Sequence, residues 1–121
     1  MNGCGCANPP PPKPAKRAMV FKVMRPAEWA AFDAGGRFEG SPDDRRDGFI
    51  HLSTAAQLAG TIDRHFAGEA ELVILAFEPA DLGADLKWEP SRGGEMFPHH
   101  YGVLEKAAIR QRRVVKPIGS G

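Results

Sequence analysis

The sequence predicts a single α+β domain, because helical and strand-like segments are interspersed along its 121 residues with few long crossovers. The clearest strand is ELVILAF (Glu71–Phe77), a continuous apolar run that is typical of a buried central strand. The clearest helix is STAAQLAGTIDRHF (residues 53–66), which opens with a capping-box pattern at Thr54 and Gln57. Its large apolar residues recur at four-residue spacing and form one stripe: Leu58, Ile62 and Phe66.

The first half of the predicted domain contains a strand, a helix and a second strand. VFKVM (Val20–Met24) has the pattern of a short strand. A helix follows in RPAEWAAFDAGG (residues 25–36), where Pro26 suits the first helical position and the two glycines end the helix. Residues 37–48 read as a polar loop, and FIHL (Phe49–Leu52) as the next strand. Alternation in that strand points Phe49 and His51 to one side and Ile50 and Leu52 to the other.

The chain after the central strand is less regular. DLKWE (Asp85–Glu89) is predicted to be a short strand, and AAIRQRRVV (Ala107–Val115) a terminal strand. Between them, residues 90–104 are rich in glycine and proline and are predicted to be irregular. A loop of this length inside a compact domain is more often functional than not.

Residues 1–18 are predicted to be a disordered tail, because they are rich in proline and glycine and carry no large apolar side chain after Met1. The single globular domain then spans residues 19–117, and residues 118–121 form a short C-terminal tail. Two alternatives stay open for the first segment. Met19 is a candidate initiator, which would exclude the tail from the native chain, or the proline run is a ligand for a partner's aromatic groove.

Composition argues against nucleic-acid and membrane partners. The formal net charge is +1, so no strong field attracts the chain to a polyanion or a lipid surface. No apolar run approaches the roughly 20 residues of a membrane span. The basic run RQRR (residues 110–113) lies in a predicted strand with few aromatic residues beside it, which is not typical of nucleic-acid binding.

The two cysteines, Cys4 and Cys6, both lie in the predicted tail and cannot link distant parts of a core. This distribution predicts a reducing, cytoplasmic location, and the N-terminal segment lacks the apolar centre of a secretory signal. A Cys-x-Cys metal site is disfavoured because no nearby His or Cys completes it.

The first candidate site lies where the second strand runs into the best helix. His51 ends that strand, and the hydroxyls of Ser53 and Thr54 follow at the helix N-terminus, where free backbone N–H groups attract anions. The alternative is structural: one hydroxyl caps the helix, and His51 is a satisfied core residue. His65, near the apolar stripe of the helix, is interpreted as structural.

The second candidate site is the segment WEPSRGGEMFPHHYG (residues 88–102). Trp88 and Phe97 are predicted to supply apolar walls, and the Arg92 guanidinium suits a carboxylate or phosphate. Gly93 and Gly94 allow close backbone approach. In extended backbone two further residues, His99 and Tyr101, face the same side while His100 faces away.

Glu89 and Glu95 in this segment are candidates for a general base or a hydroxyl anchor. The structural alternative is an ordered loop held by an aromatic anchor, with Pro98 fixing a turn. A metal site built from His51, His99 and a glutamate is disfavoured, because no pair of ligands has the spacing of one helix face. A Ser-His-Asp triad is also disfavoured, since Ser53 lacks the context of a nucleophile elbow.

The motifs DGFIHLSTAAQL and LKWEPSRGGEMFPHHYG, with FKV before a helix that contains Trp29, identify a resemblance to a known family. The chain resembles the bacterial proteins called domain of unknown function 952, over about residues 19–115. That family looks like a compact version of the ADP-ribosyltransferase fold. The resemblance therefore implies a split antiparallel β structure with two flanking helices.

The same resemblance implies roles for several residues. VFKVM resembles the first ligand-binding strand of the transferases, which places Lys22 where they keep a His or Arg for NAD. FIHLST resembles their second strand, and Glu89 or Glu95 are candidates for the catalytic glutamate of the third. The implied cofactor is NAD or a related nucleotide.

We therefore expect the chain to bind a nucleotide or another phosphate-bearing small molecule. Whether it is also an enzyme stays open, and a diverged ADP-ribosyltransferase-like enzyme is the candidate. The alternatives are a non-catalytic interaction or metabolite-binding module, and motifs with only a structural role. The oligomeric state stays open. The expected catalytic residues are Glu89 and His51, and the expected ligand-binding residues are Lys22, His51, Ser53, Thr54, Arg92, His99 and Tyr101.

Overall fold

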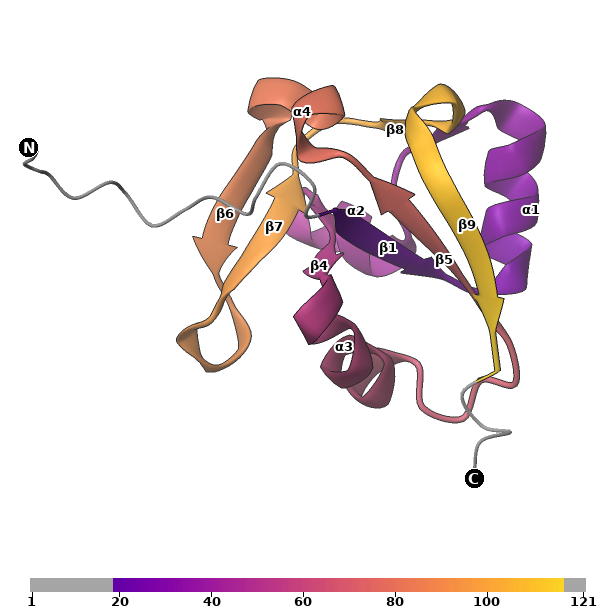
Figure 1. Ribbon diagram of the computed structural model, residues 1–121, viewed down its shortest axis with the longest axis horizontal. Helices are drawn as coiled ribbons and strands as arrows, with labels where there is room; N and C mark the ends of the chain where they lie inside the picture. The colour runs from indigo at the N-terminus through magenta and orange to yellow at the C-terminus, as the bar shows by residue number, and fades with distance from the viewer. Residues whose placement is uncertain (1–18, 117–121) are drawn as a thin grey trace, which may run out of the picture.

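The computed structural model describes residues 19–116, and the side chain of Arg92 lies outside what it describes. The predictions for residues 1–18 and 118–121 therefore fall outside the described residues. Within the described part, the chain is a mixed α/β structure whose strand pairs are all antiparallel. Figure 1 shows β1, β5 and β9 crossing the molecule side by side, with the β6–β7 hairpin standing apart from them.

The main sheet has the strand order β4-β1-β5-β9 within residues 19–116. Its strands are β1 (Val20–Met24), β4 (Ser53–Thr54), β5 (Leu72–Phe77) and β9 (Ile109–Val115). β5 is buried along its whole length, as the apolar run predicts, and pairs with β1 from Val20↔Phe77 to Met24↔Val73. β4 pairs with the start of β1, which sets Ser53 opposite Phe21.

Two smaller sheets complete the described β structure. One has the order β3-β7-β6 and consists of β3 (Ile50–His51), β7 (Met96–His100) and β6 (Leu86–Pro90). The other pairs β2 (Arg37–Phe38) with β8 (Leu104–Glu105). The two candidate segments of the sequence meet in the first of these sheets, where His51 pairs directly with His99.

Four α-helices are present in residues 19–116, rather than the two that were expected. They are α1 (Pro26–Gly35), α2 (Pro42–Asp47), α3 (Leu58–His65) and α4 (Pro79–Leu82). Short 3₁₀ turns cover Ala55–Gln57, Gly83–Asp85, Arg92–Gly94 and Lys106–Ala108. α1 confirms its predicted start at Pro26 and ends at Gly36, whose φ of 81° is a left-handed value that glycine adopts easily. The capping box of Thr54 and Gln57 is also confirmed.

Two segments predicted to lack regular structure are ordered elements. Residues 37–48 contain β2 and α2, because Ser41 and Asp44 form a capping box and Gly48, at φ 89°, ends the helix. Residues 90–104 contain β7, which is paired on both edges, and the first residue of β8. β7 was not predicted because Pro98 lies in its middle, and proline is unusual inside a paired strand. α2 was not predicted because six residues are too few to show a helical apolar periodicity.

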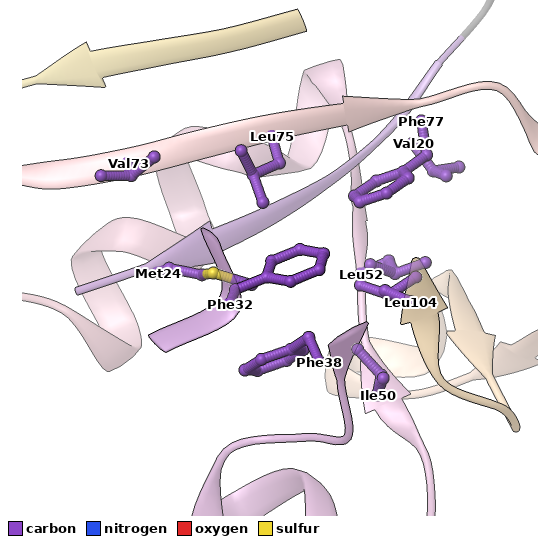
Figure 2. Packing of buried hydrophobic residues seen from close by; sticks show 10 residues of the cluster. All are labelled: Val20, Met24, Phe32, Phe38, Ile50, Leu52, Val73, Leu75, Phe77 and Leu104. Atoms are coloured by element: carbon purple, nitrogen blue, oxygen red, sulfur yellow. The ribbon is translucent and has the colours of Figure 1, made fainter. Parts of the chain in front are cut away.

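The main core fills the space between β1, β5 and α1. Figure 2 shows Phe32 of α1 pointing among side chains of the main sheet and toward Phe38. The buried cluster consists of Val20, Met24, Phe32, Phe38, Ile50, Leu52, Val73, Leu75, Phe77 and Leu104. A second cluster on the other face of β5 receives the predicted stripe of α3 through Leu58, Ile62 and Phe66. α3 therefore packs on the opposite face of the main sheet from α1.

Across residues 19–116, no helix is long and apolar enough to cross a bilayer. In the same range, no group of three or more His, Cys, Asp or Glu side chains is arranged to hold a metal ion.

Candidate functional site

A cavity of about 390 Å³ lies between the main sheet, α2, α3 and the β6–β7 hairpin. Its walls come from β1, α2, the β3–β4 segment, the C-terminal half of α3 and the hairpin. Figure 1 shows α3 and the hairpin loop projecting on the same side of β4. The volume lies within the roughly 300–1,000 Å³ of small-molecule sites.

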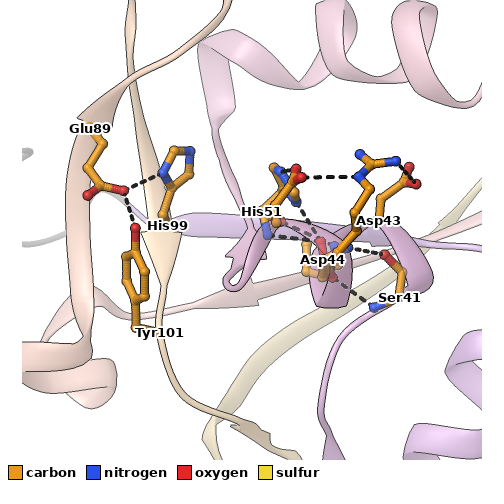
Figure 3. A network of polar contacts seen from close by, with 10 residues as sticks. Ser41, Asp43, Asp44, His51, Glu89, His99 and Tyr101 are labelled. Carbon is orange, nitrogen blue, oxygen red and sulfur yellow. Dashed lines mark hydrogen bonds and ion pairs between the residues drawn. The ribbon is translucent and has the colours of Figure 1, made fainter.

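Asp44 is the buried centre of one wall, and both of its carboxylate oxygens are saturated with hydrogen bonds (Figure 3). Oδ2 accepts from Lys22 Nζ at 2.9 Å and from the backbone N–H of Ser41 at 2.9 Å. Oδ1 accepts from His51 Nδ1 at 2.6 Å and from the His51 backbone N–H at 3.1 Å. Lys22 completes the network by donating to the backbone oxygen of His51 at 3.2 Å.

This network fixes the protonation of Asp44. Burial alone would raise the pKa of the Asp44 carboxyl, but the hydrogen bond from His51, the charge of Lys22 and the Ser41 N–H outweigh burial. The pKa of Asp44 therefore lies well below its usual range, and the side chain is an anion that joins β1, α2 and β3.

Both ring nitrogens of His51 are occupied by carboxylates. Nδ1 bonds Asp44, and Nε2 lies 3.0 Å from Asp47 Oδ2. The pKa of Asp47 is lowered, chiefly by a hydrogen bond from Arg46. The ring of His51 thus forms part of the cavity wall with no free nitrogen for chemistry, which disfavours the catalytic role expected for it.

A second, separate group is built from Glu89, His99 and Tyr101 (Figure 3). Glu89 Oε1 accepts from His99 Nδ1 at 2.7 Å and from the Tyr101 hydroxyl at 2.7 Å. The hydrogen bond from His99, followed by that from Tyr101, lowers the pKa of Glu89. The same bond to Glu89 raises the pKa of Tyr101. The alternation predicted for His99 and Tyr101 is confirmed, and His100 faces away, bonding the backbone oxygen of Val103.

Phe49 links the two histidine groups. Its ring stacks on His99 with centroids 4.0 Å apart and lies 4.7 Å from the ring of His51. The two imidazoles are 5.9 Å apart, edge to face. The wall therefore holds both histidines in fixed planes.

Among the described residues that line the cavity, His99 and Arg64 carry nitrogens with unused hydrogen-bonding capacity. Within the described residues, Nε2 of His99 has no hydrogen-bond partner, since the one bond of that ring is made by Nδ1. Arg64, on α3, lines the cavity and makes neither an ion pair nor a hydrogen bond with any described residue. The neighbouring hydroxyls of Ser53 and Thr61 bond each other at 2.8 Å.

The structure brings together part of the predicted site. Lys22, His51, Ser53 and His99 line the cavity, whereas Glu89 and Tyr101 lie behind His99 and do not line it. Thr54 caps the helix start, and the cavity follows the C-terminal half of α3 through Thr61, Arg64 and His65 rather than its N-terminus. Of the expected apolar walls, Phe97 lines the cavity and Trp88 packs against the core. The prediction for the Arg92 side chain lies outside the described residues.

Sequence reasoning missed Asp44, Asp47 and Arg64. A signal for Asp44 was present, because Ser41-Pro42-Asp43-Asp44 before Gly48 has the pattern of a capped short helix. Arg64 lies three residues after Thr61 and therefore on the same face of α3, but nothing in the sequence marks that face as a cavity wall.

These features define a class: a small mixed α/β protein with a cavity walled by two carboxylate-bound histidines. The chain belongs to the family described as Protein of unknown function (DUF952), whose model matches residues 23–112, and this confirms the predicted membership.

The chain is similar to protein CC0527 from Caulobacter crescentus, a structural genomics target. The crystal structure of that protein is 48% identical, covers 79% of this chain and 84% of that chain, and has a TM-score of 0.77. Its solution NMR structure is 48% identical, covers 78% and 82% of the two chains, and has a TM-score of 0.71. A search of curated proteins finds no match.

Proposed function

We propose that the cavity binds a small phosphate-bearing molecule of the nucleotide type. The observation that carries the proposal is the pair of unused groups in one cavity, the Arg64 guanidinium and Nε2 of His99. Three acids among the described residues line the cavity, Asp43, Asp44 and Asp47, and they are bonded to Lys22, His51 and Arg46. A ligand anion therefore finds a free cation, while the neighbouring carboxylates are already neutralised.

The remaining surface of the cavity suits the apolar part of such a ligand. The rings of Phe21, Phe66 and Phe97 contribute to the lining. An aromatic surface beside a free guanidinium matches a nucleotide, in which a flat base is joined to a charged phosphate. The proposal places this binding in the cytoplasm.

The resemblance to ADP-ribosyltransferases supports a nucleotide more than it supports transfer chemistry. Lys22 on β1 and Ser53 on the adjacent β4 line one cavity, as expected for two neighbouring ligand-binding strands. However, no glutamate is among the described residues that line the cavity, and Glu89 reaches it only through His99. NAD or a related nucleotide thus stays the proposed ligand, and a glutamate that acts directly on it is not part of the proposal.

Calorimetric titration of AMP at pH 7, with adenosine as the phosphate-free control, tests the proposal. We expect the wild type to bind AMP more tightly than adenosine. Arg64→Ala should weaken AMP binding by about tenfold or more, since a hydrogen bond to a charged group contributes roughly 1.5–3 kcal/mol. Adenosine binding should change little.

Arg113→Ala is the matched control for this experiment. It removes the same charge from an exposed position of β9, where Arg113 makes no side-chain bond with any described residue. It should bind AMP like the wild type. Equal loss in both variants would mean that only net charge matters, and equal affinity of the wild type for AMP and adenosine would refute the proposed phosphate site.

A further inference from the structure

We propose that His99 is a catalytic general base, which makes the cavity a site for hydrolysis of phosphodiesters. This inference rests on the proposed function, because it requires the phosphate to lie in the cavity beside Arg64. It differs from the expectation of the sequence, in which Glu89 and His51 were the catalytic residues. The contacts of the three side chains decide between these assignments.

The bond between His99 and Glu89 sets the tautomer of the neutral imidazole. Glu89 Oε1 lies 2.7 Å from Nδ1, and an ionised carboxylate only accepts, so the single ring proton of a neutral His99 is held at Nδ1. Nε2 then carries the lone pair. Nε2 has no hydrogen-bond partner among residues 19–116, and it belongs to a residue that lines the cavity.

The orientation of the ring is fixed as well as its tautomer. The His99 side chain is only 6% exposed, and Phe49 stacks on it at 4.0 Å with an interplanar angle of 21°. Tyr101 donates to the same oxygen of Glu89 and so holds that carboxylate in place. Glu89 and Tyr101 are therefore positioning residues, and His99 is the residue that meets the substrate.

The charged groups packed around the His99 ring are compatible with proton uptake at its Nε2. Glu89 lies at Nδ1, and the His51 ring across the edge contact is held by Asp44 and Asp47. Because both nitrogens of His51 are bonded to these carboxylates, that ring does not compete for the proton of a water. Arg64 supplies the cation that binds the phosphoryl oxygens.

In the proposed step, Nε2 of His99 accepts a proton from a water while the water oxygen forms a bond to phosphorus. The bond from phosphorus to the leaving oxygen breaks, and its electron pair stays on that oxygen, which takes a proton from the solvent of the cavity. The products are a phosphomonoester and an alcohol. The imidazolium, stabilised by Glu89 at Nδ1, then returns its proton to the solvent.

The purified full chain is assayed with bis(4-nitrophenyl) phosphate, whose leaving group needs no acid, by release of 4-nitrophenolate. The wild type should hydrolyse the diester above the buffer background. His99→Ala should lower kcat by about 10²–10⁴-fold, the usual contribution of a general base. Arg64→Ala should mainly raise KM.

Glu89→Gln tests the positioning role without emptying the site, and it serves if His99→Ala does not fold. It should lower kcat by about 10–100-fold with little change in KM. Glu71→Gln, an exposed residue with no side-chain bond to any described residue, is the matched control and should behave like the wild type.

Three outcomes overturn the inference. They are no hydrolysis by a folded wild type, hydrolysis that survives His99→Ala, and equal kcat for Glu89→Gln and Glu71→Gln. If the diester is not hydrolysed while AMP still binds in an Arg64-dependent manner, only the catalytic inference falls. If AMP also fails to bind, the proposed function falls with it.

Discussion

Asp44→Asn should destabilise the protein by about 3–5 kcal/mol, because it removes one partner of a buried ion pair and leaves the charge of Lys22 uncompensated. The Asp44 side chain is 2% exposed and that of Lys22 is 7% exposed, so water cannot replace the lost carboxylate. The change also weakens the bonds to Ser41 and His51. Urea unfolding at pH 7, followed by circular dichroism, measures the effect.

Asp43→Asn is the control for this substitution. Asp43 is the preceding residue of α2, but its ion pair with Arg46 is exposed and should contribute little to stability. Since the pKa of Asp44 is lower in the folded than in the unfolded protein, its contribution is present above about pH 4 and is lost as the pH falls below that value. Asp44→Asn lacks this titrating group, so its stability should fall less steeply than that of the wild type as the pH is lowered below about 4. A loss for Asp44→Asn no larger than for Asp43→Asn would contradict the network.

Phe32→Ala should cost about 3–5 kcal/mol, because it empties a fully buried position where α1 meets the core. The Phe32 ring packs on Trp29 at 5.8 Å and on Phe38 at 5.7 Å between centroids. Phe38 in turn lies 5.7 Å from Lys22 Nζ and precedes the helix that carries Asp44. Phe32 therefore packs against the ring that contacts Lys22 of the site.

Phe32→Leu is the comparison for this prediction. Leucine keeps most of the apolar contact, so its cost should be well below that of alanine. Urea titration of both variants gives their free energies of unfolding, and the loss for Phe32→Ala should clearly exceed that for Phe32→Leu. Similar small losses for both would show that α1 is not anchored through this ring.

Much of the fold could be predicted because its signals are local. The apolar run of β5, the proline and glycines that bound α1, and the Thr54–Gln57 capping box each lie within a few residues. β7 and α2 could not be predicted in the same way. β7 has Pro98 in its middle and is stabilised by pairing with two strands distant in sequence, and α2 is too short to show an apolar stripe.

In the candidate site, too, features with local sequence signals could be predicted and features that depend on tertiary packing could not. His99 and Tyr101 could be placed on one side of the chain from alternation alone, and both indeed bond Glu89. The partners of His51 could not be inferred from its strand, because Asp44 belongs to a helix that was read as a solvated loop. The contact between Lys22 and Asp44 spans 22 residues, and Arg64 depends on how α3 packs. Such groupings arise from tertiary packing and leave little trace in sequence.

The most direct test of the central claim is an amide NMR titration of the wild type with AMP. We expect the shifts to concentrate in segments that wall the cavity: residues 51–53, 61–66 and 97–99. The same titration of Arg64→Ala should show much smaller shifts at equal AMP. Shifts confined to β9 or to the exposed face of α1, or no shifts at millimolar AMP, would contradict a phosphate-binding cavity between α3 and the β6–β7 hairpin.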